Sequence, residues 1–449
     1  MTTRKFADIL LSINSVNASA IEASVDAFVD TIGVALAGTS EDCSVISQRW
    51  LRSTQSKPQA VVWGTDIVCS VSDAAFANGI SSHALDFDDA MPTLRGHPSA
   101  TLVPTIMACG EYMNASGLKM LEAYVVGVEV CGILGTSLGA GHYVRGWHTT
   151  ATVGIFASTV AAARILGLNT EQLINAWGIA ASQVSGLVCN FGTMAKPFHA
   201  GNAARSAIIS ASMAKIGFTA NIGIFDDDST FLHTYGDDRS VPLSKLINNI
   251  GDVWQVNNPG VFVKKWPCCY CNHRPLGGLI ELFDKHQIQL DDVQEVRVGF
   301  LPGSDAALIS ENPLTGLEGK FSIEYCMAAT MLDNKLNLDS FTDQMVQRPL
   351  VRQIMKKVKR IRTPGEGLFS GVVGYTNLEI DTAKGNYKIC VDRIPGSPSW
   401  PLSDLDKKDK FLDAAGRSLG PNVTQHLFEQ LKNLPKFDHV NDLSKLLTV

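Results

Sequence analysis

The chain has 449 residues, of which 45% are hydrophobic and 18% charged, and its formal net charge is −6 at pH 7. A chain of this length exceeds one ordinary hydrophobic core and predicts two domains. The acidic balance excludes the basic surface of a nucleic-acid-binding protein and the polybasic patch of a membrane-surface protein.

The start of the chain shows no apolar run of a signal peptide. We expect a reducing, cytoplasmic location because most of the cysteines lie in apolar surroundings without a disulfide pattern. The most apolar helical stretch, residues 123–140, is interrupted by Glu129 and four glycines, which favours a core helix over a membrane span. The ten cysteines follow no extracellular disulfide spacing, so we expect free thiols. The cysteine-rich run at 268–273 lacks a second Cys/His pair at a zinc-finger spacing, so we expect no zinc there.

The first 260 residues have helical periodicity and no convincing period-two alternation. The predicted helices cover residues 19–37, 70–85, a segment starting at 99, and then 117–138, 149–167, 170–187 and 199–216. The first helix ends at Gly38, a residue type that favours a C-cap. Asp26 and Asp30 lie four residues apart on that helix, and we interpret them as a solvated face. This part of the chain is therefore predicted to be all-helical.

The pattern changes after Pro267. Three segments alternate like strands, at 293–301, 375–381 and 387–392, and helical patterns cover 276–286, 325–332 and 350–361. Residues 396–401 form a linker, and two amphipathic helices that we expect to pack on the first domain end the chain. The fold class is therefore mainly α, with an all-helical domain over 1–266 and 400–449 and a smaller α+β domain over 267–399.

A first polar cluster lies at residues 83–89 and 97–99, where three carboxylates and two imidazoles occur within fifteen positions. Charged groups are costly to bury unless they are paired or used, and this region is otherwise apolar. Ser72 or Asp73 is expected to cap the helix before it, which would place His83 and Asp86 on one face. The cluster is either a buried hydrogen-bond network or a catalytic or metal site, and the residues alone leave both open.

Two further segments suit an anionic ligand. His148, with Arg145 three residues before it, precedes a predicted helix N-terminus, where unpaired N–H groups attract anions. Lys196 stands at the mouth of another predicted helix, with His199 and Arg205 after it, and a lysine beside apolar surface can act as a base. The alternatives are a capping threonine beside a loop histidine in the first segment, and a surface lysine with a core histidine in the second.

A third segment lies at the predicted domain junction, a favoured place for ligand clefts. It contains Lys264, Lys265 and His273. Tyr325 could add a phenol as an acid or hydrogen-bond donor, although a buried aromatic at helical spacing explains it more simply.

Other chemistries find little support in the sequence. The chain has no GxxxxGK[ST] loop, no GxGxxG after a strand and no GxSxG elbow. The DDxxD motif of prenyl-diphosphate enzymes is absent because Pro92 stands where its third aspartate would be. Metal binding by Asp86, Asp88 and Asp89 with the histidines stays open.

Together these motifs resemble the MmgE/PrpD family. The matching segments are N-G at 78–79, H-A-L-D-F-D-D at 83–89, H-P-S at 97–99, G-T-x-x-K-P-x-H-x-G-x-x-A-R at 192–205 and F-S-x-x-Y at 321–325. Their order and spacing cover nearly the whole chain, so the match is specific. The resemblance implies a large helical domain with an α+β lid, a homodimer, a small di- or tricarboxylic acid as substrate, and no required metal or organic cofactor.

The resemblance also implies a set of site residues. The catalytic set is Asp86, His97, His148, Lys196 and Tyr325. The substrate-binding set, which adds residues from the segments above, is His83, Asp89, Arg145, His199, Arg205, Lys264, Lys265 and His273. The shared chemistry is the handling of a proton alpha to a carboxylate, which needs a cationic cradle and a tuned acid/base pair.

One departure decides the predicted reaction. Dehydratases and decarboxylases of the family typically carry Thr and then an aromatic residue where this chain has Ala90 and Met91. Since the pocket hydroxyl is then missing, and since the chain is short like the epimerase branch, the sequence favours a cofactor-independent isomerase, iminodisuccinate epimerase. The alternatives are a lyase, either a 2-methylcitrate-type dehydratase or a cis-aconitate-type decarboxylase, and a non-catalytic helical dimer that binds carboxylates.

Overall fold

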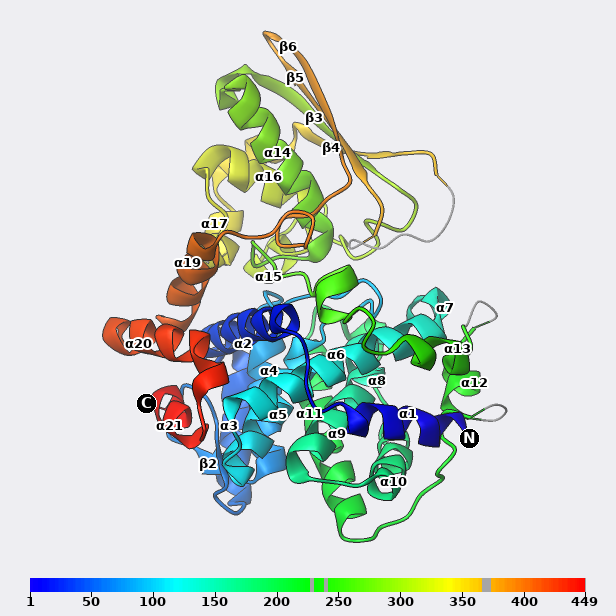
Figure 1. Ribbon diagram of the computed structural model, residues 1–449. Helices are drawn as coiled ribbons and strands as arrows, with labels where there is room; N and C mark the ends of the chain where they lie inside the picture. The colour runs from blue at the N-terminus through cyan, green and yellow to red at the C-terminus, as the bar shows by residue number, and fades with distance from the viewer. Residues whose placement is uncertain (227–229, 238–240, 366–372, 449) are drawn as a thin grey trace. The chain divides into compact units, whose positions relative to one another are not determined.

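The computed structural model describes residues 1–226, 230–237, 241–365 and 373–448 (Figure 1). The chain divides into two compact units by its internal contacts. Unit 1 comprises Met1–Val261 and Asp404–Val449, and unit 2 comprises Phe262–Ser403. The domain boundaries expected from the sequence, after residues 266 and 399, stay a prediction.

Unit 1 is built almost wholly from helices. In chain order they are α1 (Thr2–Ser12), α2 (Ala18–Gly38), α3 (Asp42–Thr54), α4 (Val71–His83), α5 (Ser99–Met113), α6 (Gly117–Leu138), α7 (Ala140–Val144), α8 (Thr149–Thr152), α9 (Gly154–Leu166), α10 (Thr170–Ala181), α11 (Ala195–Lys215), α12 (Phe231–Tyr235), α13 (Leu243–Leu246), α19 (Asp404–Ala415), α20 (Pro421–Lys432) and α21 (Asn441–Ser444). The N-cap side chains that start α4 and α6, Ser70 and Ser116, each accept a hydrogen bond from a backbone N–H of the first turn. The helices predicted at 19–37, 70–85, from 99, 117–138 and 199–216 are confirmed, but the segment 149–167 forms two helices, α8 and α9, and α10 ends at Ala181 instead of at residue 187.

Helix α11 lies in the middle of unit 1 and packs against α4, α5, α9 and α10. Its closest approach is to α4, where a Cβ atom built on Gly79 would lie 2.8 Å from the Cα atom of Gly201. A Cβ atom built on Gly201 would lie 2.3 Å from the carbonyl oxygen of Phe76. Only glycine at both positions lets the two backbones approach this closely. The polar ends of α4 and α11 are therefore brought together by small residues.

Two apolar segments of unit 1 are long enough to cross a membrane by length and composition, Gly117–Leu138 and Thr149–Leu166. In their most apolar windows, 89% and 94% of the residues are buried inside the protein. Core helices of water-soluble domains have the same length, composition and burial.

Three details of unit 1 differ from the sequence-based expectation. The unit is not entirely helical, because Ala60–Val61 (β1) and Val68–Cys69 (β2) form a short antiparallel pair. The cap of α4 is Ser70 instead of Ser72 or Asp73. Asp30 is buried instead of solvated, because it forms an ion pair with Lys410 of α19.

Unit 2 contains a four-stranded mixed sheet with the strand order β4-β3-β5-β6. Its strands are β3 (Val293–Phe300), β4 (Val358–Arg362), β5 (Thr376–Thr382) and β6 (Gly385–Val391), and its helices are α14 (His273–His286), α15 (Gly316–Gly319), α16 (Ile323–Asp333), α17 (Asp343–Val346) and α18 (Pro349–Met355). Strands β3 and β4 are parallel and the other neighbours antiparallel, and α14 packs against β5 and β6. The chain is thus mainly helical with a small mixed sheet in its C-terminal part, as predicted.

One element of unit 2 was predicted wrongly. The segment 350–361 was expected to be one helix, but the helix α18 ends at Met355 and β4 begins at Val358. Val358 and Ile361 pair with Val296 and Gly299 of β3, so a long-range strand partner overrides the local helical pattern.

The contact between α4 and α11 gives a stability prediction. Replacing Gly201 by Ala places a methyl group against the Phe76 carbonyl, and overpacking of this kind costs about 1–3 kcal/mol. We expect Gly201→Ala to lower the midpoint of urea unfolding followed by circular dichroism. Gly420→Ser is the control, because a Cβ atom there has open space and serine is a good N-cap for α20. Equal midpoints for the two variants would contradict the close-packing argument.

Candidate active site

The loop between α4 and α5, residues 84–98, begins with a turn that carries the first carboxylate of the site. Helix α4 ends at His83, and Asp86 follows with a φ of 53°, in the left-handed region. Its Oδ1 atom accepts a hydrogen bond of 2.6 Å from the Nζ atom of Lys196, and both residues are buried. The expected sharing of a helix face by His83 and Asp86 is therefore wrong, because the helix ends before Asp86.

The second carboxylate, Asp88, lies between two imidazoles. Its Oδ2 atom is 2.7 Å from the Nδ1 atom of His83 and 3.3 Å from the Nδ1 atom of His97. The Nδ1 atom of His97 also lies 2.6 Å from the carbonyl oxygen of Asp89, an acceptor. Because these nitrogens face acceptors, we assign the hydrogen to Nδ1 in both rings, which leaves each Nε2 atom with a lone pair.

Burial decides the charge of this group. Burial lowers the pKa of His83 to about 4, although the adjacent Asp88 favours the protonated ring. Burial raises the pKa of the Asp88 carboxyl, but the charges and hydrogen bonds of His83 and His97 outweigh it and hold that pKa well below its ordinary value. At neutral pH the group therefore contains an ionised Asp88 and a neutral His83.

A third and a fourth imidazole extend the cluster towards α11. The rings of His148 and His83 are stacked with their centroids 5.7 Å apart, and the Nδ1 atoms of His148 and His199 are 3.1 Å apart. Phe191 lies edge-on to His148, and the Lys196 ammonium lies 5.2 Å from the Phe191 ring. Burial lowers the pKa of His148, and neighbouring His83 and Lys196 lower it further, so this ring is neutral.

His148 is fixed by its backbone. Its N–H group donates to the carbonyl oxygen of Gly186, and it occupies the N-cap position of the short helix α8 without a side-chain cap bond. The imidazole is therefore not used as a cap and points to the other histidines.

Asp89 has a different role from Asp86 and Asp88. It accepts hydrogen bonds from the hydroxyl and the backbone N–H of Ser99, whose hydroxyl is also 2.6 Å from the Tyr124 hydroxyl. Burial raises the pKa of Asp89 to about 8, and the nearby Asp30 and Asp88 contribute to the increase. Because its side chain bonds to Ser99 and its carbonyl to His97, Asp89 positions other groups at the start of α5.

The remaining predicted residues of unit 1 lie apart from this cluster. The Arg205 guanidinium is 3.3 Å from Asp73 and lies over the Trp50 and Phe76 rings. Arg145 is exposed and donates a 2.5 Å hydrogen bond to the carbonyl oxygen of Tyr235. It lines a cavity of about 430 Å³ that also contains Asp226 and Asp237. The structure thus brings together His83, Asp86, Asp89, His97, His148, Lys196 and His199.

Unit 2 holds the other predicted residues. Lys264 and His273 are buried, and the His273 ring lies between Trp266 and Tyr270, with centroids 5.2 and 4.9 Å away. Lys265 is exposed, with its ammonium 6.0 Å from the Trp266 ring. The Tyr325 hydroxyl is buried and donates to the carbonyl oxygen of Ser340. Burial also raises the pKa of that phenol.

Four residues of the cluster have the donor atoms of a metal site. Atoms of His83, Asp86, Asp88 and His97 lie within 4.8 Å of one another, and imidazoles with carboxylates suit zinc. However, the Lys196 ammonium occupies the Oδ1 atom of Asp86, and both imidazoles use a nitrogen to bond Asp88. The expectation that the site needs no metal stays a prediction.

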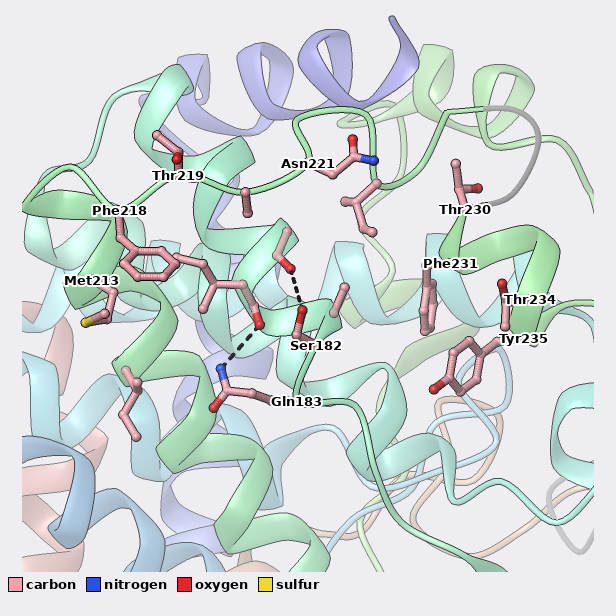
Figure 2. A pocket seen from close by; sticks show the side chains of 16 residues that line it. Ser182, Gln183, Met213, Phe218, Thr219, Asn221, Thr230, Phe231, Thr234 and Tyr235 are labelled. Carbon is pink, nitrogen blue, oxygen red and sulfur yellow. Dashed lines mark hydrogen bonds between the residues drawn. The ribbon is translucent and has the colours of Figure 1, made fainter.

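Unit 1 also has an apolar cavity of about 760 Å³ at the C-terminal end of α10 (Figure 2). Phe218, Phe231 and Tyr235 are among its lining residues, with Ser182 and Gln183, whose side chains bond back to carbonyl oxygens of α10. None of its sixteen lining side chains is charged. Because it lacks a cation, this cavity does not suit a polycarboxylic acid.

Two residues of the cluster were not among the predicted site residues. Asp88 was noted as part of the acidic run, but its bridging position depends on the turn at Asp86. A signal was present, because a carboxylate five residues after His83 and nine before His97 can reach both rings only if the chain turns sharply. Phe191 had no recognisable signal, since it lies in an irregular segment before α11.

The comparisons with known proteins identify the family. The MmgE/PrpD N-terminal domain matches residues 5–244, and the MmgE/PrpD C-terminal domain matches residues 266–434. The chain therefore belongs to the MmgE/PrpD family.

Its similar relatives include several cis-aconitate decarboxylases. The human protein is 27% identical over 460 residues, which cover 97% of this chain and 92% of the relative. The mouse protein is 28% identical over 470 residues, which cover 99% and 93%. The protein of Aspergillus terreus is 26% identical over 307 residues, which cover 64% of this chain and 62% of the relative. These relatives are lyases, so the comparisons favour the lyase alternative of the sequence analysis and give the epimerase interpretation no support.

The raised pKa of Asp89 predicts how stability changes with pH. A carboxyl whose folded-state pKa lies above its unfolded-state value stabilises the fold at low pH, and this contribution is lost as the pH rises through about 8. Asp89→Asn cannot ionise, so its melting temperature should fall less than that of the wild type between about pH 6 and pH 9.

The matched control is Asp66→Asn. Asp66 is fully exposed, and its hydrogen bond with Arg52 lowers its pKa, so it titrates only in acid. Its variant should follow the wild-type curve above pH 6. Parallel curves for Asp89→Asn and the wild type would show that Asp89 is already ionised in the folded protein.

Proposed function

We propose that this protein is a cofactor-independent lyase acting on a small polycarboxylic acid, and that decarboxylation of cis-aconitate is its reaction. The observation that carries the proposal is the buried Lys196–Asp86 ion pair beside neutral His83 and His148. The cis-aconitate decarboxylases among its relatives support the substrate class.

The chemistry requires a cation and a proton donor in the site. When a C–C bond to a carboxylate breaks, CO₂ leaves and its electron pair remains on the substrate. That pair is delocalised into the neighbouring conjugated carboxylate, which needs a cation close by. A carbon atom then takes up one proton from an acid, which completes the exchange of CO₂ for hydrogen.

The cluster can supply these groups. We assign Lys196 as the cation that binds a substrate carboxylate and stabilises the developing charge, with Asp86 holding its ammonium in place. We assign His97 as the acid: its Nδ1–H group bonds to the Asp89 carbonyl and to Asp88, so the lone pair on Nε2 can take up a proton from solvent and then pass it to the substrate carbon. His148 adds a polar group, and because its ring is neutral it does not compete with Lys196 for the substrate carboxylates.

Epimerisation of an amino-dicarboxylate such as iminodisuccinate is a second candidate. Ala90 favours it, because this buried residue provides no hydroxyl where lyases of the family typically carry threonine. An epimerase needs only deprotonation on one side of a carbon and reprotonation on the other, and the same lysine and histidine could perform these steps.

Proton NMR in D₂O separates the candidates. EDTA-treated protein is incubated in turn with cis-aconitate, 2-methylcitrate and iminodisuccinate. Loss of a carboxylate from cis-aconitate with one carbon-bound deuterium supports the proposal. New vinyl signals from 2-methylcitrate would indicate a dehydratase instead. Deuterium at an alpha position with interconverting diastereomers and no alkene would indicate an epimerase, and saturable binding with no change in any acid would indicate a binding protein.

Lys196 gives a sharper test of the assigned roles. Lys196→Met removes the cation that stabilises charge in the transition state, so we expect kcat to fall by about a hundredfold to ten-thousandfold. Lys215→Met on the same helix is the control, because among the described residues its ammonium donates to the Leu166 carbonyl oxygen and to no group of the site. Circular dichroism and melting curves check that both variants fold. Full activity of folded Lys196→Met would exclude this role for Lys196.

A further inference from the structure

The turn that carries Asp86 and Asp88 is contacted by a residue that is far away in the sequence. Lys410 of α19 donates a 3.1 Å hydrogen bond from Nζ to the carbonyl oxygen of Phe87. The same ammonium lies 4.0 Å from the centroid of the Phe87 ring. Phe87 is the residue between the two carboxylates, so Lys410 contacts both its backbone and its side chain.

Lys410 itself is fixed by a buried ion pair. Its Nζ atom is 2.5 Å from the Oδ1 atom of Asp30 in α2, and the two side chains are 6% and 5% exposed. A buried lysine is costly unless its charge is neutralised and its hydrogens are bonded. Asp30 supplies the opposite charge, and the Phe87 carbonyl takes a second hydrogen bond. Because α19 packs along α2, the position of the ammonium is set by two helices.

The turn needs such an anchor. Asp86 has a positive φ, which costs free energy for a residue with a side chain and persists only where the surroundings hold it. Asp86 and Asp88 also face different partners, Lys196 on one side and the imidazoles of His83 and His97 on the other. A rotation of the Phe87 peptide would therefore move both carboxylates away from their partners at once.

We propose that Lys410 is a positioning residue that holds the Phe87 peptide and thereby sets the places of Asp86 and Asp88 in the active site. The inference rests on the proposed function for its kinetic test. It gives α19, the first helix of the C-terminal segment of unit 1, a part in the reaction through its contact with Phe87.

The helix offers a matched control. Lys407 lies three residues earlier on α19 and also pairs with an aspartate of α2, its Nζ atom being 2.6 Å from the Oδ2 atom of Asp26. It links the same two helices, and within the described residues its ammonium pairs with Asp26 and Asp404 and not with Phe87. Lys407→Met thus removes an α19–α2 ion pair and leaves the turn untouched.

The kinetic test compares Lys410→Met, Lys410→Arg and Lys407→Met, each checked for folding by circular dichroism. Misplacement of reacting groups by about 1 Å costs about a hundredfold, so Lys410→Met should lower kcat by at least about tenfold with little change in KM. Arginine can still donate to both Asp30 and Phe87, so Lys410→Arg should recover most of kcat. Lys407→Met should keep wild-type kcat and KM. Equal kcat for Lys410→Met and Lys407→Met would overturn the proposal.

The double variant Asp30→Asn/Lys410→Met separates positioning from charge balance. It removes the unpaired carboxylate that Lys410→Met leaves in the interior but does not restore the bond to Phe87. Kcat should therefore stay low in the double variant even where its melting temperature recovers. A return to wild-type kcat would show that only the buried charge mattered, and the proposal would fail.

A second readout does not depend on the reaction. Hydrogen exchange of a peptide covering residues 84–91 should be faster in Lys410→Met than in Lys407→Met under conditions where both are folded. If the wild type converts none of the three acids, the proposed function fails, and this exchange difference still tests the positioning role. Equal exchange in the two variants would overturn the positioning role whatever the reaction is.

Discussion

The ionised carboxylate of Asp88, buried and shared by His83 and His97, is the interaction on which the site depends. An unpaired carboxylate in an apolar interior is unstable, and breaking a buried pair by removing one partner costs about 3–5 kcal/mol. Its neighbours obey the same constraint, since Asp86 pairs with Lys196 and Asp30 with Lys410. The acidic run between α4 and α5 therefore requires the two imidazoles that flank it, His83 and His97, and the ammonium of Lys196 from the distant helix α11.

Close packing of small residues makes these pairings geometrically possible. His83 follows Gly79 by one helical turn on α4, and Lys196 precedes Gly201 on α11 by little more than one turn. The contact between the two glycines brings both polar ends within reach of the turn at 84–89. A bulkier crossing would separate the ends and leave Asp86 without its ammonium. The chemistry of the site thus depends on glycines that bear no functional group themselves.

The sequence could predict much of this fold because the relevant signals are local. Serine caps and apolar periodicity define α4 and α6, and strict alternation defines β5, whose residues are alternately buried and half-buried along the strand. The signal failed where a distant partner decides the structure. Val358 begins a strand only because β3 provides hydrogen bonds, and Asp30 is buried only because a lysine nearly four hundred residues later pairs with it.

The difference between local signals and long-range partners also applies to the site. His83, His97, Lys196 and His148 could be selected from residue type and motif spacing, because imidazoles and a lysine beside apolar helices suit an anionic ligand. The spacing of Asp88 from His83 and His97 was visible in the sequence, but its bridging role was missed because it depends on the sharp turn that the positive φ of Asp86 makes. Arg205 shows the opposite error: its spacing from Lys196 suits a carboxylate receptor, but Asp73 and two aromatic rings already engage its guanidinium.

The site also explains why motif spacing alone could not separate a lyase from an epimerase. Both reactions place negative charge on a carbon next to a carboxylate, and both need a nearby cation and a proton donor. They differ in which bond lies perpendicular to the plane of the developing charge, a C–C bond to a carboxylate or a C–H bond. That choice depends on how the substrate is oriented, so groups that orient it without reacting decide the outcome. The resemblance implies that Ala90 is such a position, and in the proposed function the orientation of the substrate then depends on the ammonium of Lys196 and the imidazoles beside Asp88.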